Sequence, residues 1–316
     1  MKILSSESYQ HIRTWMYRNA RPLELALWQY SFENGSKDNV ISILTFYQNE
    51  DGGFGHSLEA DNWNPDSTPY TTLYAINILR LIGFNELSHP IYQGILRFLE
   101  SGVHLAEYGW LFSIPSNNEY PHAPWWTYNI EANKTESIGI TAELAAFILK
   151  NCDHNSELYN KALSIAKYIC EKLKIQSNFG DLGINGYCVL LDVIKTEEYK
   201  AEIDYDYLHA TVKDLVYKSI ERDVSRWAVY GVRPSNYITA PESMFYKENE
   251  DIVETELDYL IDTIPENNVW GITWTWFDNT PQYAKEFTIS ENWWKAYKAI
   301  EKGSFLRNFG RIACPA

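Results

Sequence analysis

Cysteine is scarce in this sequence: 316 residues contain four, which are Cys152, Cys170, Cys188 and Cys314. They lack both the CxxC spacing of a thiolate zinc site and the density of a disulfide-bonded secreted domain. We therefore expect four reduced thiols, most of them buried. Apolar runs of the roughly eighteen residues that a membrane helix needs are also missing, and the N-terminus has no apolar signal segment. These absences predict a cytoplasmic protein without a membrane span.

Positive charge is scarce as well, since 27 Lys and Arg residues face 42 Asp and Glu residues and leave a net charge of −15. Nucleic acids and anionic membrane surfaces select dense basic patches, so neither is an expected partner. Aromatic residues are abundant, with 12 Trp and 23 Tyr. Aromatic rings beyond those that a core needs usually line a pocket, which favours a small-molecule substrate. The oligomeric state stays open.

Helical periodicity dominates the chain. Residues 156–173 carry one apolar stripe and predict an amphipathic helix, whereas residues 136–151 are apolar nearly all round and predict a helix enclosed by others. Residues 67–83 are of the second type, with Ser67 as the N-cap and Gly83 as the stop. Half-exposed and buried helices therefore alternate.

Five helical hairpins follow from this alternation, and most turn through a glycine beside an aromatic residue. They pair 38–47 with 67–83, 90–100 with 136–151, 156–173 with 184–194, 208–221 with a helix near Glu242, and 251–264 with 290–302. Residues 8–34 supply a possible sixth hairpin, and residues 269–277 are expected to form a loop rather than a strand. We predict an all-α fold, a single α/α-toroid domain over residues 1–316, with an inner ring of buried helices inside an outer ring. All long loops then open at one end, where function is expected.

The segment QNEDGGFG at residues 48–55, followed by TTLYAINIL from Thr71, resembles the repeat of the α/α-toroid superfamily of terpenoid cyclases and protein prenyltransferases. More narrowly, DGGFGHSLEAD from Asp51, APWW at 123–126 and YGVRP at 230–234 resemble bacterial stand-alone toroids called prenyltransferase-like. We expect the glycines of the first motif to reverse the chain at positive φ. Phe54 should pack into the wall, and Gln48 and Asp51 should tie adjacent backbone groups.

The sequence also departs from that superfamily. Where the prenyltransferases hold zinc with an Asp-x-Cys pair, the nearest segment here is Asn185-Gly-Tyr-Cys188, so no zinc is expected. The Asp-x-Asp-Asp acid of the cyclases is intact in neither nearby segment, residues 59–62 or 64–67.

The catalytic candidates are acids in the loop before the helix at 67–83, together with one histidine. Glu59 and Asp61 are interpreted as a general acid and its partner, or as ligands of a hard cation. The cation would be Mg²⁺ or Ca²⁺, and the alternative is that the protein uses no cofactor. Asp66 is a third candidate, although an acid just before a helix also complements the helix dipole. His122 is a candidate base, with a surface histidine as the alternative.

Candidate substrate-binding residues are aromatic side chains in the long loops and one cation, Arg233, whose alternative role is a salt bridge. A single cation argues against a diphosphate ester as substrate in the absence of a metal. The full set is Trp63, Trp125, Trp126, Arg233, Tyr237, Trp274, Trp276 and Trp293.

Three functions remain open on this sequence. The first is a toroid enzyme that acts on an isoprenoid or similarly apolar substrate, with Glu59 and Asp61 at its centre. The second is a carbohydrate-active lyase or hydrolase, because paired carboxylates and tryptophan faces also suit glycosides. The third is a binding protein without catalysis, which holds a ligand or peptide at the acidic loops.

Overall fold

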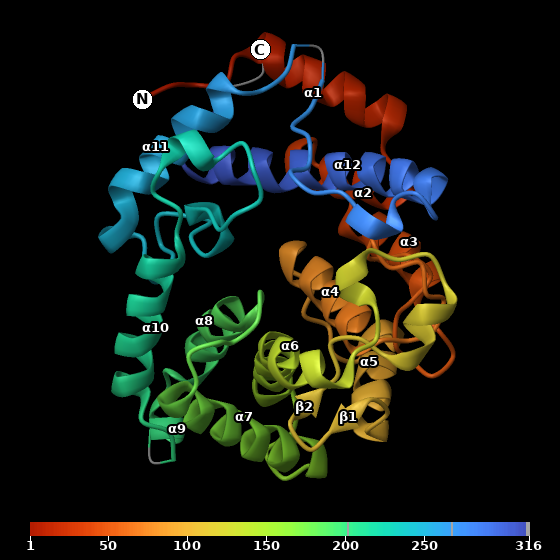
Figure 1. Ribbon diagram of the computed structural model, residues 1–316, viewed down its shortest axis with the longest axis vertical. Coiled ribbons are helices and arrows are strands. Elements are labelled where there is room, and N and C mark those ends of the chain that lie inside the picture. Colours follow the sequence, from red (N-terminus) through yellow and green to blue (C-terminus); the bar gives the residue numbers. More distant parts are fainter. Residues whose placement is uncertain (201, 267, 314–316) are drawn as a thin grey trace. The chain divides into compact units, whose positions relative to one another are not determined.

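The computed structural model describes residues 1–200, 202–266 and 268–313, and these residues are mostly helical (Figure 1). The only sheet in this part of the chain pairs β1 (Leu105–Ala106) with β2 (Gly109–Trp110). The all-α prediction is confirmed. The closed double ring and the single domain stay predictions, because the contacts divide the chain into two compact units. Unit 1 comprises residues 1–44 and 216–316, and unit 2 comprises residues 45–215.

Unit 2 is built around α6 (Ile130–Asn151), which is buried on nearly every face from Ser137 to Leu149. Gly139 of α6 and Gly186 of α8 let the two helices approach closely, since a Cβ on Gly186 would lie 2.4 Å from the Gly139 carbonyl oxygen. The other elements of the unit are η1 (Thr45–Tyr47), α4 (Pro69–Leu81), α5 (Pro90–Ser101), η2 (Pro115–Glu119), η3 (Pro124–Trp126), α7 (Glu157–Ile175), α8 (Gly183–Ile194) and α9 (Glu197–Lys200); α10 (Tyr205–Ser219) crosses into unit 1.

Side chains cap the helix ends, and of the two predicted end residues the N-cap Ser67 is wrong and the stop Gly83 is confirmed. Ser156 caps α7 as its side chain accepts the Tyr159 N–H at 3.1 Å. The cap of α4 is Thr68 rather than Ser67, because the Ser67 hydroxyl instead donates to Asp51 at 2.7 Å. Gly83 follows the end of α4 at a φ of 61°, as a stop signal should.

The glycine-rich turn at residues 52–55 is structural, but not entirely for the predicted reason. Gly52 has a φ of 95°, whereas neither Gly53 nor Gly55 has positive φ. These two glycines are required because there is no room for a side chain. A Cβ on Gly53 would lie 2.5 Å from the Cβ of Ser67, and a Cβ on Gly55 would lie 2.2 Å from the Pro65 carbonyl oxygen. Phe54 is fully buried, as predicted.

The predicted hydrogen bonds from the side chains of Gln48 and Asp51 to nearby backbone groups are confirmed. Gln48 donates to the carbonyl oxygens of Gly52 at 2.9 Å and Ile91 at 3.0 Å, and Asp51 accepts the Gly53 N–H at 2.9 Å. Polar side chains thus satisfy the backbone where the chain reverses.

Unit 1 contains the hairpin predicted in residues 8–34, as α1 (Ser6–Asn19) and α2 (Pro22–Phe32), beside α12 (Ala284–Asn308) (Figure 1).

No strand forms in 269–276, as expected. The helix predicted near Glu242 is wrong: residues 238–246 form turns, in which the Ser243 hydroxyl accepts the N–H groups of Thr239 and Ala240 at 3.1 Å each. The remaining elements are α3 (Lys37–Leu44), η4 (Val224–Arg226), η5 (Pro234–Asn236), η6 (Lys247–Asn249), α11 (Glu250–Asp262) and η7 (Phe277–Asn279).

The described cysteines are free thiols, as predicted, but fewer are buried than expected. Cys170 is buried, whereas Cys152 and Cys188 are half-buried, and Cys314 lies outside the described residues. Among the helices that the structure describes, none is long and apolar enough to cross a membrane.

Candidate functional site

The loop between η1 and α4 in unit 2 carries the three candidate acids, and the structure separates them. Glu59 and Asp61 are 2% and 1% exposed. The Glu59 carboxylate accepts the Asp61 backbone N–H at 3.0 Å, which fixes the first side chain on the local backbone. Asp66 lies at the surface, and its N–H donates to the side-chain oxygen of Asn64 at 2.9 Å. The buried pair is therefore the core of the candidate site.

A second segment, residues 112–128, lies against this loop and brings His122 to it. The Ala123 N–H donates to the Asp61 carbonyl at 2.9 Å, and the Trp63 N–H donates to the Pro121 carbonyl at 3.0 Å. His122 is buried, with Nδ1 2.6 Å from the Tyr120 carbonyl oxygen and Nε2 3.0 Å from the Thr127 hydroxyl. A carbonyl oxygen can only accept, so Nδ1 carries a proton and donates it to Tyr120. The surface alternative for His122 is wrong.

Buried amides hold the two segments in register, and none of them was among the predicted site residues. Asn64 donates to the Asn117 side-chain oxygen and to the Ser116 hydroxyl, both at 2.9 Å, and Asn117 donates to the Trp126 carbonyl at 2.9 Å. Asn64 is 1% exposed and Asn117 is fully buried. A run of asparagines beside the candidate acids was the available signal, because buried amides must find partners.

The tryptophans of this region divide into packing and partly accessible side chains. Trp126 is 2% exposed and lies between Tyr70 and Phe112, with ring centroids 4.4 and 4.5 Å away. Trp63 and Trp125 are half-buried, and the Trp63 indole N–H donates to the Ala60 carbonyl at 3.1 Å. Only the half-buried pair offers ring surface to a ligand.

The structure thus brings Glu59, Asp61, His122 and the tryptophans of 63 and 125–126 together in unit 2. No group of three or more His, Cys, Asp or Glu side chains is arranged to hold a metal ion within the described ranges. Binding of Mg²⁺ or Ca²⁺ by Glu59 and Asp61 stays a prediction.

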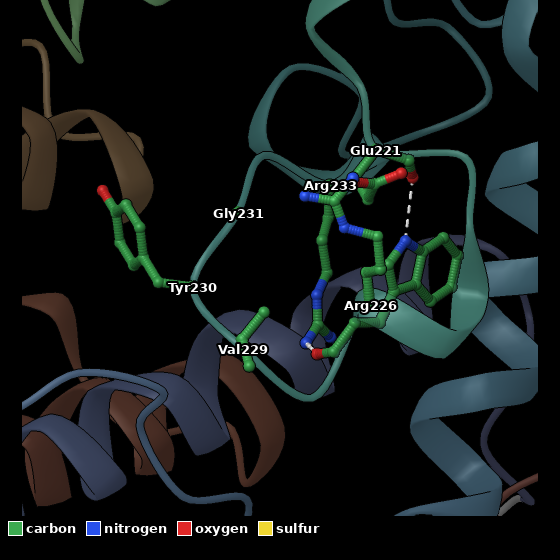
Figure 2. A pocket seen from close by; sticks show the side chains of 7 residues that line it. Glu221, Arg226, Val229, Tyr230, Gly231 and Arg233 are labelled. Atoms are coloured by element: carbon green, nitrogen blue, oxygen red, sulfur yellow. Dashed lines mark hydrogen bonds and ion pairs between the residues drawn. The ribbon is translucent and has the colours of Figure 1, made fainter.

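The other candidates lie in unit 1. Arg233 donates to the Trp227 carbonyl, and its Cζ lies 5.2 Å from the Tyr259 ring centroid and 5.7 Å from that of Trp227. Arg233 also lines a hollow of about 30 Å³ together with Arg226 and Tyr230. Figure 2 shows the Tyr230 ring projecting away from both arginines. Such a hollow holds about one water molecule, so it cannot enclose an isoprenoid by itself.

The unit 1 aromatics differ in what they contact. Trp276 is fully buried and packs against Phe287, with centroids 6.0 Å apart, so its role is packing. Trp293 lies under the Arg21 guanidinium at 4.7 Å, and the Tyr237 hydroxyl accepts from Ser219 at 3.1 Å. Trp274 is half-buried and meets Trp294 edge to face at 5.3 Å.

A third buried carboxylate of unit 2, Glu143, was not among the candidate residues. It projects from the apolar helix α6, and its oxygens accept from Asn77 of α4 and Asn185 of α8 at 3.3 Å each, with Arg80 at 3.8 Å. Burial raises the pKa of the Glu143 carboxyl, and Arg80 and the two amides oppose that shift. A single charged residue within the otherwise uncharged stretch 137–149 was the available signal.

Comparisons with protein-family models, with curated proteins and with solved structures gave no match to this chain. Membership of the toroid superfamily therefore stays a prediction from the motifs at residues 48–55, 123–126 and 230–234.

Proposed function

We propose that this protein is an enzyme of the terpenoid-cyclase and prenyltransferase-like kind, which acts on an isoprenoid or a similarly apolar small molecule. In this proposal Glu59 and Asp61 act together as the general acid and its partner. The observation that carries it is the pair of carboxyl side chains, 1% and 2% exposed, in a single loop. Carboxyl groups are common general acids, and the Glu59 side chain is held on the Asp61 backbone N–H at 3.0 Å.

The aromatic surroundings support an apolar substrate. Trp63 and Trp125 are half-buried, and they belong to the two segments that also carry Glu59, Asp61 and His122. Aromatic faces stabilise carbocations and pack against prenyl chains. The same faces stack on sugar rings, so the carbohydrate-active alternative is an outcome of the test.

The first experiment is a thermal-shift screen with isoprenoid diphosphates, neutral polyprenyl chains and oligosaccharides, each with and without Mg²⁺ or Ca²⁺. A ligand at a hundredfold its Kd stabilises by about 2.7 kcal/mol, which raises the melting temperature measurably. Stabilisation by isoprenoids supports the proposal. Stabilisation by oligosaccharides alone would replace it with a glycan-directed function.

The second experiment follows product formation by mass spectrometry with the stabilising compound. Asp61→Asn should lower turnover by about 10²- to 10⁴-fold while circular dichroism and melting temperature stay close to wild type. The matched control is Glu50→Gln, which makes the same kind of change at an exposed position before the glycine turn. Full activity of Asp61→Asn would contradict the assignment.

A further inference from the structure

Three helices of unit 2 bring polar side chains together around the buried carboxylate of Glu143. Asn77 and Arg80 lie one turn apart on the same face of α4. Glu143 belongs to α6 and Asn185 to α8, and we call these four residues the Glu143 cluster. Both amides donate to the Glu143 carboxylate at 3.3 Å, which is long for a hydrogen bond. The Glu143 side chain is 6% exposed and that of Arg80 is 47% exposed, so the cluster extends from the interior of the unit to its surface.

Two groups of the Glu143 cluster have hydrogen-bonding capacity left over. The Asn77 Oδ1 atom is buried, and it has no hydrogen-bond partner among the residues that the structure describes. Burial of an acceptor without a donor is unfavourable. The Arg80 guanidinium lies 3.8 Å from the Glu143 carboxylate, which is too long for a hydrogen bond. The cluster therefore offers one acceptor and one charged donor to a further group.

A hydroxyl group matches both of these, because it accepts through its oxygen and donates through its hydrogen. An ammonium group or a metal cation cannot accept from Arg80 and would lie beside its positive charge. An ionised phosphate or carboxylate cannot donate to Asn77 and would lie beside the Glu143 carboxylate. The chemistry of the cluster thus favours an alcohol.

A half-buried stripe on α4 leads to the cluster. Tyr70, Tyr74 and Asn77 are half-buried at positions i, i+4 and i+7, whereas the other residues between them are buried. The Tyr70 ring lies 4.4 Å from that of Trp126 and 5.7 Å from that of Phe112, measured between centroids. Seven residues of α-helix span about 10 Å along the axis. An apolar chain can therefore lie along the tyrosines while its polar end reaches Asn77.

We propose that the Glu143 cluster binds the hydroxyl group of an isoprenoid alcohol, whose apolar chain lies along Tyr70 and Tyr74. The hydroxyl accepts a hydrogen bond from Arg80 and donates one to the Asn77 Oδ1. Asn77 is itself half-buried, so a small rotation of its amide about a soft terminal torsion can present the oxygen to the ligand. This inference rests on the proposed function, from which it takes the apolar substrate, and adds that the polar end is an alcohol rather than a diphosphate.

The test is isothermal titration calorimetry of the full chain with probes that share one ten-carbon isoprenoid chain. They are geraniol, its methyl ether, the hydrocarbon of the same chain, and geranyl diphosphate. The ether keeps the oxygen acceptor and loses the O–H donor, and the hydrocarbon loses both. Wild type should bind geraniol at least about tenfold more tightly than the ether, and the ether more tightly than the hydrocarbon.

Two variants assign this selectivity to single side chains. Asn77→Leu should reduce the preference for geraniol over its ether to about twofold or less, because the acceptor for the O–H is gone. Arg80→Met should remove the preference for the ether over the hydrocarbon, and its half-exposed position makes it the variant of choice if Asn77→Leu fails to fold. Asn160→Leu makes the first change at an exposed position of α7 and should keep the wild-type selectivity.

The outcomes separate this inference from the proposed function. Equal binding of geraniol, ether and hydrocarbon by wild type would overturn the alcohol site and leave an apolar substrate in place. Tighter binding of geranyl diphosphate than of geraniol would overturn it as well, as would a preference for geraniol that Asn77→Leu retains. Binding of no probe would contradict both proposals. Asp61→Asn should bind geraniol as wild type does, so its loss of turnover is a separate readout.

Discussion

The backbone N–H of Ala123 donates a 2.9 Å hydrogen bond to the carbonyl oxygen of Asp61, and this bond joins the two segments of the candidate site. Because the bond uses backbone atoms, the Asp61 side chain can be exchanged for asparagine without breaking it. Asparagine also has nearly the same size as the buried aspartate that it replaces. The Asp61→Asn variant is therefore expected to stay folded while its turnover falls.

Gly55→Ala is expected to destabilise unit 2. An added Cβ would lie 2.2 Å from the Pro65 carbonyl oxygen and 2.4 Å from that of Asp66, and backbone atoms cannot move aside cheaply. Overpacking of this kind costs about 1–3 kcal/mol, measurable by urea denaturation. Gly271→Ala is the control, because nothing lies within 4 Å of its added Cβ. Equal stability of the two variants would show that the loop rearranges freely.

Trp126→Ala should cost about 3–5 kcal/mol, since it removes a buried ring packed against Tyr70 and Phe112. The neighbouring Trp125 is only half-buried, so Trp125→Ala should cost clearly less. Urea denaturation of both variants measures the difference. A cost for Trp126→Ala no larger than that for Trp125→Ala would contradict a packing role.

Glu143 should make stability depend on pH in a defined direction. Burial raises its pKa above the ordinary 4.5, so the folded state binds more protons than the unfolded state above that value. This contribution to stability is fully present below pH 4.5 and is lost as the pH rises through the folded-state pKa. The Glu143→Gln variant has no ionisable group at this position, so its free energy of unfolding does not fall for this reason as the pH rises.

The stability of Glu143→Gln relative to wild type should therefore increase from about pH 4 towards pH 7, measured as the difference between their unfolding free energies. Glu136 and Glu256, whose pKa values are also raised mainly by burial, cancel in this difference. A difference that does not change with pH would show that Glu143 is not desolvated.

The three described cysteines should resist alkylation in the folded protein. Burial is the largest cause that raises the pKa of Cys152 to about 11 and the pKa values of Cys170 and Cys188 to about 12. The thiolate is the reactive form, so iodoacetamide at pH 8 should modify them at least about a hundredfold more slowly than in urea. Peptide mapping by mass spectrometry separates these sites from Cys314. Rapid native modification of Cys170 would contradict its burial.

Much of the secondary structure could be predicted from the sequence, because its causes are local. The apolar period of residues 156–173 predicted α7, which spans Glu157–Ile175. The buried helix predicted over 136–151 also exists, although α6 begins earlier, at Ile130, where the Asn129 side chain caps it. A hydrophobic period and a capping residue act within a few positions of the chain, so sequence alone determines them.

Only the tertiary structure decided which side chains meet. It shows that Gly55 is required by the approach of Pro65 rather than by positive φ, and that Trp126 packs between Tyr70 and Phe112. It also adds Asn77 and Asn185 to Glu143. Each of these contacts joins residues that are separated in the sequence. Their distances depend on how helices pack, which residue pattern alone does not encode.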